Sequence, residues 1–181
     1  MDALDALTRR VSVPVLTGPD ITEQQIDTLI RAALRAADHA WLRPSRYLSI
    51  QGDARQRLGD VFAATEPDAD PNRIERLKAM PMRAPLILVA ISSITEHPKV
   101  PETEQLMSTA AGVQNLLNAA WAMQLGAVWR TGALAYHPAI KTALGLASHE
   151  RLVGFIYLGH INGNTKAVPE LNPADYCQAW S

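Results

Sequence analysis

The chain has 181 residues and a formal net charge of −1 at pH 7; 48% of its residues are hydrophobic and 19% are charged. This length and composition predict a single globular domain spanning residues 1–181, without a charge bias towards nucleic acid or an anionic membrane surface. Its longest apolar run is far shorter than the roughly 18 residues of a membrane-spanning helix.

The N-terminal half is expected to alternate helices with a strand. Thr22 and Gln25 form the pattern of a capping box, and apolar residues recur at helical spacing after them. Asp70 followed by Pro71 is typical of the first residues of a helix. The expected elements are, in chain order, a helix at 2–7, a helix from about 22 to 37, a strand at 47–50, a helix at about 53–64 and a helix beginning at Pro71.

The C-terminal half is expected to place two buried strands around the longest helix. Gly126 is expected to end that helix, and Gly145 the next one. The expected elements are a strand at 85–91, a helix at 102–125, a short strand within 127–133, a helix at 138–144, a strand at 152–158 and an extended arm from 162 to 181. Helices between strands predict an α+β or α/β fold with a sheet of four or five strands, and periodicity leaves the strand direction open.

Most catalytic signatures are absent from the sequence. It contains no glycine-rich dinucleotide motif, P-loop, serine elbow or zinc-protease motif, and its five histidines are scattered, so no metal site is expected. The only cysteine, Cys177, has neither a partner for a disulfide nor an activating neighbour. Arg9 and Arg10 are not followed by the apolar stretch of a secretory signal, which favours a cytoplasmic protein.

Three groups of hydrogen-bond donors remain as candidates for binding. Arg10 and Ser12 alternate across Val11, so an extended chain points both to one side, where they suit a phosphate; a solvated arginine and a capping serine are the alternative. Arg35 and His39 are four residues apart, so a persistent helix would place them on one face, and the alternative is an interaction with the helix C-terminus.

The third group follows the predicted strand within 127–133. Arg130 offers a planar fork of donors to a phosphate, and Gly132 allows a ligand to approach the backbone closely. An ordinary turn with a solvated charge is the alternative.

Taken together, these groups resemble the flavin-dependent nitroreductase family, in its compact YdjA type. The segments that carry the resemblance are Arg10-Val11-Ser12, Arg35-Ala36-Ala37-Asp38-His39, Trp129-Arg130-Thr131-Gly132-Ala133, Arg83-Ala84-Pro85-Leu86-Ile87, His97-Pro98-Lys99-Val100-Pro101 and Val153-Gly154-Phe155-Ile156-Tyr157-Leu158-Gly159. Their order and spacing extend the resemblance over nearly the whole chain.

The resemblance implies a nitroreductase-like α+β fold with a central mixed sheet flanked by helices. It also implies an intertwined homodimer with one FMN in each of two interface clefts, and NADH or NADPH as co-substrate. FMN would transfer hydride by a ping-pong route to nitroaromatic, quinone or similar acceptors, with no catalytic side chain required. The implied cofactor-binding residues are Arg10, Val11, Ser12, Arg35, His39, Trp129, Arg130, Thr131 and Gly132, with Arg35 and His39 coming from the partner subunit.

The sequence departs from the family pattern at three places near this site, one of which is Gly126-Ala127, with fewer glycines than usual before the tryptophan. Val11 stands where relatives commonly have a second arginine, which weakens the expected hold on FMN by about 1 kcal/mol. Trp41 stands in a segment that is usually more polar, and the resemblance implies that it would reshape or partly fill the acceptor side. Two other functions therefore stay open: a flavin-binding carrier or sensor without nicotinamide turnover, and an interaction domain that has lost flavin.

Overall fold

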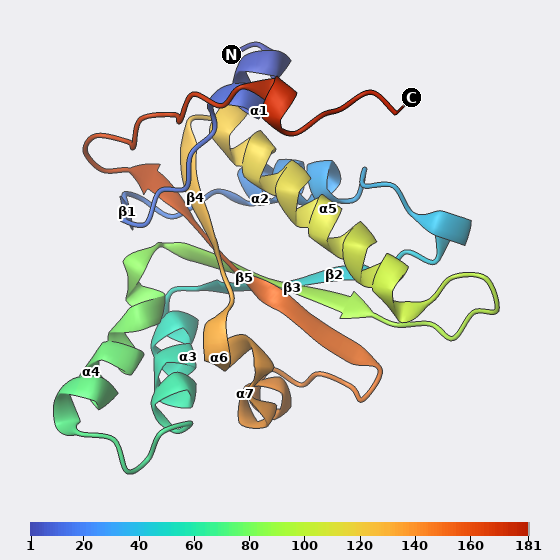
Figure 1. Ribbon diagram of the computed structural model, residues 1–181. Helices are drawn as coiled ribbons and strands as arrows, with labels where there is room; N and C mark the ends of the chain where they lie inside the picture. The colour runs from blue at the N-terminus through green and yellow to red at the C-terminus, as the bar shows by residue number, and fades with distance from the viewer. Residues whose placement is uncertain (181) are drawn as a thin grey trace.

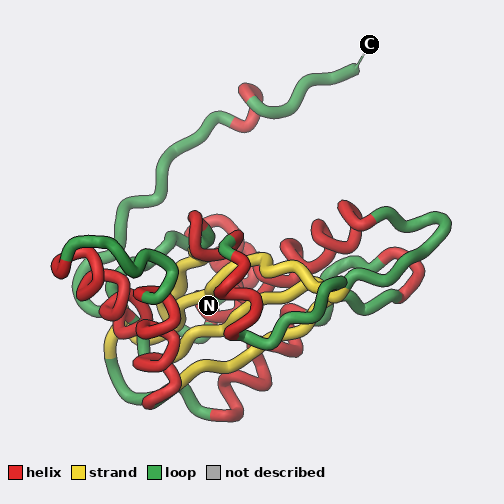
Figure 2. Tube along the Cα trace, turned by 90° about the horizontal axis from the view of Figure 1, so that it is seen from below, coloured by secondary structure: helices red, strands yellow, loops and turns green. Residues whose placement is uncertain are grey.

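The computed structural model describes residues 1–180 and forms a five-stranded sheet with helices on both faces (Figures 1 and 2). The strands are β1 (Leu16–Thr17), β2 (Ser45–Gln51), β3 (Leu86–Ser93), β4 (Leu125–Arg130) and β5 (Glu150–Ile161). Strand β5 pairs with β1, β3 and β4, and β2 pairs with β3. The predicted α+β architecture, with helices flanking a central sheet, is confirmed.

The helices agree with most of the sequence signals. They are α1 (Ala3–Arg9), α2 (Glu23–Ala33), α3 (Asp53–Ala63), α4 (Pro71–Ala79), α5 (Glu102–Ala122), α6 (Gly132–Tyr136) and α7 (Pro138–Ala143), with 3-10 turns η1 (His39–Trp41), η2 (Met80–Arg83) and η3 (Pro173–Asp175). The capping box of Thr22 and Gln25 is present, and the Asp70 side chain accepts a hydrogen bond from the Arg73 N–H. Both caps are confirmed. No helix within residues 1–180 is long and apolar enough to cross a membrane.

The expectation of a mixed sheet is wrong for the described strands, because all four pairings are antiparallel. Between β2 and β3 the chain forms two helices, α3 and α4, which contact each other. In a parallel pair of strands, one crossover helix returns the chain to the end of the sheet where the first strand began. Here a second helix follows the first and returns the chain to the end of the sheet where β2 ended. Strand β3 therefore begins at that end and runs antiparallel to β2.

Strand β3 separates two hydrophobic cores, because its residues are buried on both faces. Residues 87, 89 and 91 join Phe62 and residues of α3, α4 and α7. Residues 86, 88 and 90 join residues of α2 and α5 on the other face. This period of two is what a strand imposes, and full burial of each large aliphatic side chain stabilises the fold by about 1.5–3 kcal/mol.

The predicted end of the long helix is wrong by several residues. Helix α5 ends at Ala122, and Gln124 adopts the left-handed conformation that was expected of Gly126. Gly126 instead lies in β4, where a Cβ would meet the side chains of Leu16 and Val13. Its lack of a side chain therefore serves close packing of the N-terminal segment against the sheet.

An ion pair connects two strands across β3. The Arg46 guanidinium on β2 makes a two-pronged contact with the Glu150 carboxylate at the start of β5, and the Ala147 N–H donates to the same carboxylate. The hydrogen bond from Arg46 is the main cause that lowers the pKa of Glu150 from 4.5 to about 2. Only 7% of the Glu150 side chain is exposed, so the contact is shielded from water.

Glu150→Gln is expected to lower the free energy of unfolding by about 1.5–3 kcal/mol near neutral pH, because it removes a buried charge-assisted contact. The folded-state pKa lies below the unfolded one, so this stabilisation is complete above pH 4.5 and is lost as the pH falls towards about 2. Urea unfolding at about pH 7 and about pH 3 measures it. Glu102→Gln, which removes the exposed pair with Arg151, is the control and should cost at most about 1 kcal/mol. A loss from Glu150→Gln that is equally large at both pH values would contradict this account.

Candidate functional site

A cavity of about 430 Å³ lies at the end of β4, on the face of the sheet that carries α3 and α4. It is lined by Phe62, Glu66, Arg73, Met80, Arg83, Val128, Trp129, Arg130, Thr131, Gly132, Ala133, Leu134, Phe155 and Tyr157. We call it the strand-end cavity. It contains the whole third group of donors predicted from the sequence.

Arg130 has an unused donor in this cavity. Its guanidinium carbon lies 5.5 Å from the centre of the Tyr157 ring, a cation–π contact. Its Nε atom is buried and has no hydrogen-bond partner within residues 1–180. Because a buried donor without an acceptor is unfavourable, this atom suits an anionic ligand that enters the cavity.

Burial raises the pKa of Tyr157 to about 12, although Arg130 and Arg83 oppose this effect. The phenol therefore stays neutral at physiological pH. Three arginines line the cavity, and within residues 1–180 only Arg73 has a carboxylate partner, Glu66. The strand-end cavity is thus electropositive.

Gly132 leaves an open space in the cavity wall. Its φ angle is +69°, and within residues 1–180 no atom outside its chain neighbours and its own helix backbone lies within 4 Å of the place where a Cβ would be. A side chain would therefore be strained and would occupy the space where a ligand could approach the backbone. Gly132 is thus open at the end of β4, and its contact with a ligand stays a prediction.

Trp129 and Arg130 direct their side chains to opposite faces of the sheet. The Trp129 indole donates to the Val153 carbonyl at 3.2 Å and packs on the core formed with α2 and α5. A Cβ on Gly154 would collide with this indole. The glycine is therefore required for the tryptophan side chain to occupy this position against β5.

The N-terminal donors lie on a segment fixed beside β4. The Val13 N–H donates to the Ala127 carbonyl at 3.0 Å. Val11 packs against the core on the strand-end face, whereas Ser12 is exposed. Arg10 is half-buried, and its Nη1 atom has no hydrogen-bond partner within residues 1–180. Arg10 therefore provides a second unused buried donor, outside the lining of the strand-end cavity.

The second predicted group has a different geometry from that expected. Helix α2 ends at Ala33, so Arg35 and His39 do not share a helix face, and His39 begins η1. Its Nδ1 donates to the Glu104 carboxylate at 2.7 Å, which leaves Nε2 for a ligand. The helix stops early because the chain leaves it through two tight turns, from Arg35 to Ala32 and from Ala36 to Ala33.

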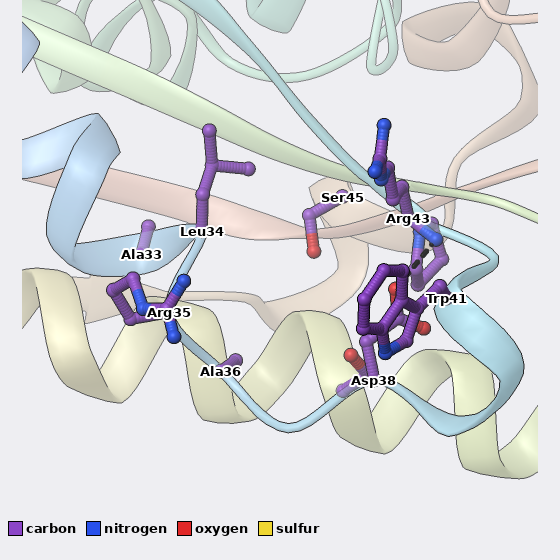
Figure 3. A pocket seen from close by; sticks show the side chains of 10 residues that line it. Ala33, Leu34, Arg35, Ala36, Asp38, Trp41, Arg43 and Ser45 are labelled. Atoms are coloured by element: carbon purple, nitrogen blue, oxygen red, sulfur yellow. Dashed lines mark hydrogen bonds between the residues drawn. The ribbon is translucent and has the colours of Figure 1, made fainter.

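Arg35 lines a separate cavity of about 500 Å³, shown in Figure 3. We call it the turn cavity. It is lined by Ala33, Leu34, Arg35, Ala36, Asp38, Trp41, Arg43, Pro44, Ser45 and Ser108. It shares no residue with the strand-end cavity and lies against the core of the opposite face, to which Ala33 belongs. One chain therefore does not bring Arg35 to Arg130.

Several wall residues were not predicted as site residues. Tyr157 reads as an ordinary buried strand residue, and Glu66 and Arg73 read as surface charges of a turn and a helix. Only the pairing of β4 with β5 brings Tyr157 beside the strand end, and only the packing of α3 and α4 brings the ion pair there. No local pattern carries that information.

The model of the nitroreductase family matches residues 7–160, and the chain belongs to that family.

Among curated proteins, the Escherichia coli (strain K12) protein named "Putative NAD(P)H nitroreductase YdjA" is 36% identical over 177 residues, covering 97% of this chain and 96% of its own. A nitroreductase-like family protein from Bacillus cereus has a similar structure, with a TM-score of 0.86, 22% identity and coverage of 99% and 96%. A nitroreductase with bound FMN from Bacteroides fragilis has a TM-score of 0.75 at 14% identity, with both chains covered completely. At these identities the two structures support the fold alone.

Proposed function

We propose that residues 1–181 form one FMN-binding domain of a homodimeric NAD(P)H oxidoreductase of the nitroreductase family, acting in the cytoplasm. The observation that carries this proposal is the buried, unpartnered Nε of Arg130 beside the open backbone at Gly132. The names of the relatives support the same activity: the YdjA relative is named for NAD(P)H, and the Bacteroides fragilis structure contains FMN.

The residues present fit the chemistry of FMN. Its phosphate is an anion and suits the unused donors of Arg130 and Arg10. Ser12 is exposed and free to contact the ribityl chain, and Thr131 and Gly132 provide the approach to the backbone. Val11 turns into the core, so it contributes packing to this segment and no charge.

Bound FMN would accept a hydride from NADH or NADPH and pass two electrons, with two protons from the donor and solvent, to a nitroaromatic, quinone or similar acceptor. The protein residues then bind and orient, and the donor and the acceptor use the same cleft in turn. Because the protein residues only bind and orient the flavin and its substrates, no acid–base dyad is needed at the strand end.

The opposite placement of the two cavities supports a cleft shared between two chains. Arg35 and His39 lie on the α2–α5 side of the sheet and Arg130 opens on the α3–α4 side. A second copy can supply Arg35 and His39 to the strand-end cavity. Residues 162–180 form an exposed arm that extends away from the sheet (Figure 2), with Leu171, Tyr176 and Trp180 largely in solvent. Such an arm suits contact with a second copy.

The visible spectrum of the FMN-reconstituted protein tests the proposed activity directly. Flavin absorbance should persist through gel filtration and should bleach on anaerobic addition of NADPH or NADH, and the faster donor identifies the preference. Flavin that is retained but not bleached would support a carrier or sensor instead. A protein that retains no flavin would contradict both functions.

Arg130→Ala is expected to weaken FMN binding more than about tenfold, a loss of about 1.4 kcal/mol, because it removes a buried donor to the phosphate. Fluorescence titration with FMN measures this affinity, and thermal unfolding checks the fold. The control is the pair Glu66→Gln with Arg73→Gln, which removes charges from the same cavity without changing its net charge. That control should stay within about twofold of the native affinity. Unchanged affinity in Arg130→Ala would remove this residue from the site.

Mixing two variants tests whether the cleft is shared. Arg35→Ala and Arg130→Ala should each bind FMN weakly as separate homodimers. If the two side chains serve one cleft from different subunits, a dimer with one copy of each variant contains one intact cleft and one doubly altered cleft. Mixing under subunit exchange should therefore restore tight FMN binding to part of the clefts. No restoration in demonstrated mixed dimers would contradict the shared cleft.

A further inference from the structure

The turn from Asp38 to Arg43 holds three side-chain-bearing residues in a backbone conformation that normally favours glycine. Ala40, Trp41 and Arg43 have φ angles of +59°, +55° and +50°. A left-handed conformation is unusual for a residue as bulky as tryptophan. Strained residues of this kind persist where the surroundings fix them, and they gather at binding sites.

Contacts with two neighbouring elements fix this turn. The Ser108 hydroxyl on α5 donates to the Ala37 carbonyl at 2.8 Å, and His39 contacts Glu104 on the same helix. The Ser93 N–H at the end of β3 donates to the Pro44 carbonyl at 2.7 Å. Inside the turn, the Arg43 N–H donates to the Asp38 carboxylate at 2.7 Å. The position of Trp41 is therefore held from both sides.

The fixed turn presents the Trp41 indole to the turn cavity. Trp41 is 79% exposed, and its side chain lies beside Asp38 and Arg43, with Arg35 on the far side of the cavity (Figure 3). The cavity volume of about 500 Å³ is that of a small-molecule site. An open indole face on a fixed turn, next to a cavity, is suited to stacking on a planar ring.

The charges around the indole indicate the second property of the ligand. Arg35 and Arg43 line the cavity with Asp38, which gives it a net positive charge. Neither arginine forms an ion pair within residues 1–180. Tryptophan and arginine are both common at subunit interfaces, so it is the cavity volume together with this unpaired positive charge that favours a small anionic ligand beside Trp41.

We propose that Trp41 is a specificity-determining residue that stacks on planar aromatic electron acceptors, and that Arg43 favours acceptors carrying an anionic group. The inference rests on the proposed function, because it assigns the turn cavity to the acceptor side of the flavin cleft. A nitrobenzoate has both properties: a planar ring that stacks and a carboxylate that pairs with a guanidinium.

Calorimetric titration of the oxidised, FMN-reconstituted protein with 4-nitrobenzoate, without any nicotinamide, tests the binding step. Trp41→Gly should weaken binding about tenfold or more, whereas Trp41→Phe, which keeps a ring, should weaken it less than about threefold. Trp180→Ala removes another exposed tryptophan and should leave binding unchanged. Equal affinity in the native protein and Trp41→Gly would overturn the proposal.

Trp41→Gly also separates a binding role from a structural one. Glycine accepts a positive φ angle without strain, so the melting temperature of this variant should be unchanged or higher while its affinity falls. A lower melting temperature, or dissociation of a dimer in sedimentation, would identify Trp41 as a packing or interface residue and overturn the proposal. Arg43→Gln should weaken binding of 4-nitrobenzoate but not of neutral 4-nitrobenzyl alcohol, and equal losses for both would overturn the role of Arg43.

Reduction assays keep this inference distinct from the proposed function. Ferricyanide accepts electrons without stacking, so Trp41→Gly should lower kcat/KM for 4-nitrobenzoate about tenfold more than it lowers ferricyanide reduction with NADH or NADPH. If the native protein does not reduce ferricyanide with either donor, the oxidoreductase function fails. In that case the calorimetric comparison still decides whether Trp41 binds planar aromatic anions.

Discussion

The pairing of β5 with its neighbours is the constraint on which both cavities depend. Its register with β4 places Arg130 opposite Phe155, and its register with β3 separates the two cores. A shift of one residue between β4 and β5 would move Arg130 to the opposite face and Trp129 into its place. The collision that a side chain on Gly154 would make with the indole fixes the same register. Strand pairing therefore determines which donors meet.

Short sequence patterns predicted the starts of helices well. Asp70 with Pro71 and Thr22 with Gln25 each satisfy free backbone groups at a helix start, and both caps form as expected. Helix ends were harder, because Gln124 takes a left-handed conformation that its residue type does not favour. Strand direction was not predictable from periodicity, because periodicity indicates which face of the sheet a residue occupies and not which way the neighbouring strand runs. The two-residue strand β1 carries too short a pattern to detect.

The candidate site could be predicted only where it is local in sequence. Residues 129–132 form one wall because they are consecutive at a strand end. Tyr157 reaches the same wall through strand pairing, and Arg73 reaches it through helix packing, so neither has a local signal. The interval from Arg35 to His39 suggested a shared helix face, but the helix ended at Ala33 and a turn fixed by α5 replaced it. Contacts distant in sequence thus decide the geometry of this group.

The two cavities differ in how their walls are held, and this difference fits the functions proposed for them. The strand-end cavity lies on paired strands and a packed core, which suits a cofactor that remains bound. The turn cavity is bounded by a strained turn whose side chains project into solvent. A substitution at Trp41 alters that wall without touching the sheet, whereas a change at Gly154 disturbs the strands themselves. Because hydride transfer through a flavin needs no side-chain acid or base, the proposed selectivity among acceptors falls to such wall residues, and they can vary while the cofactor site stays intact.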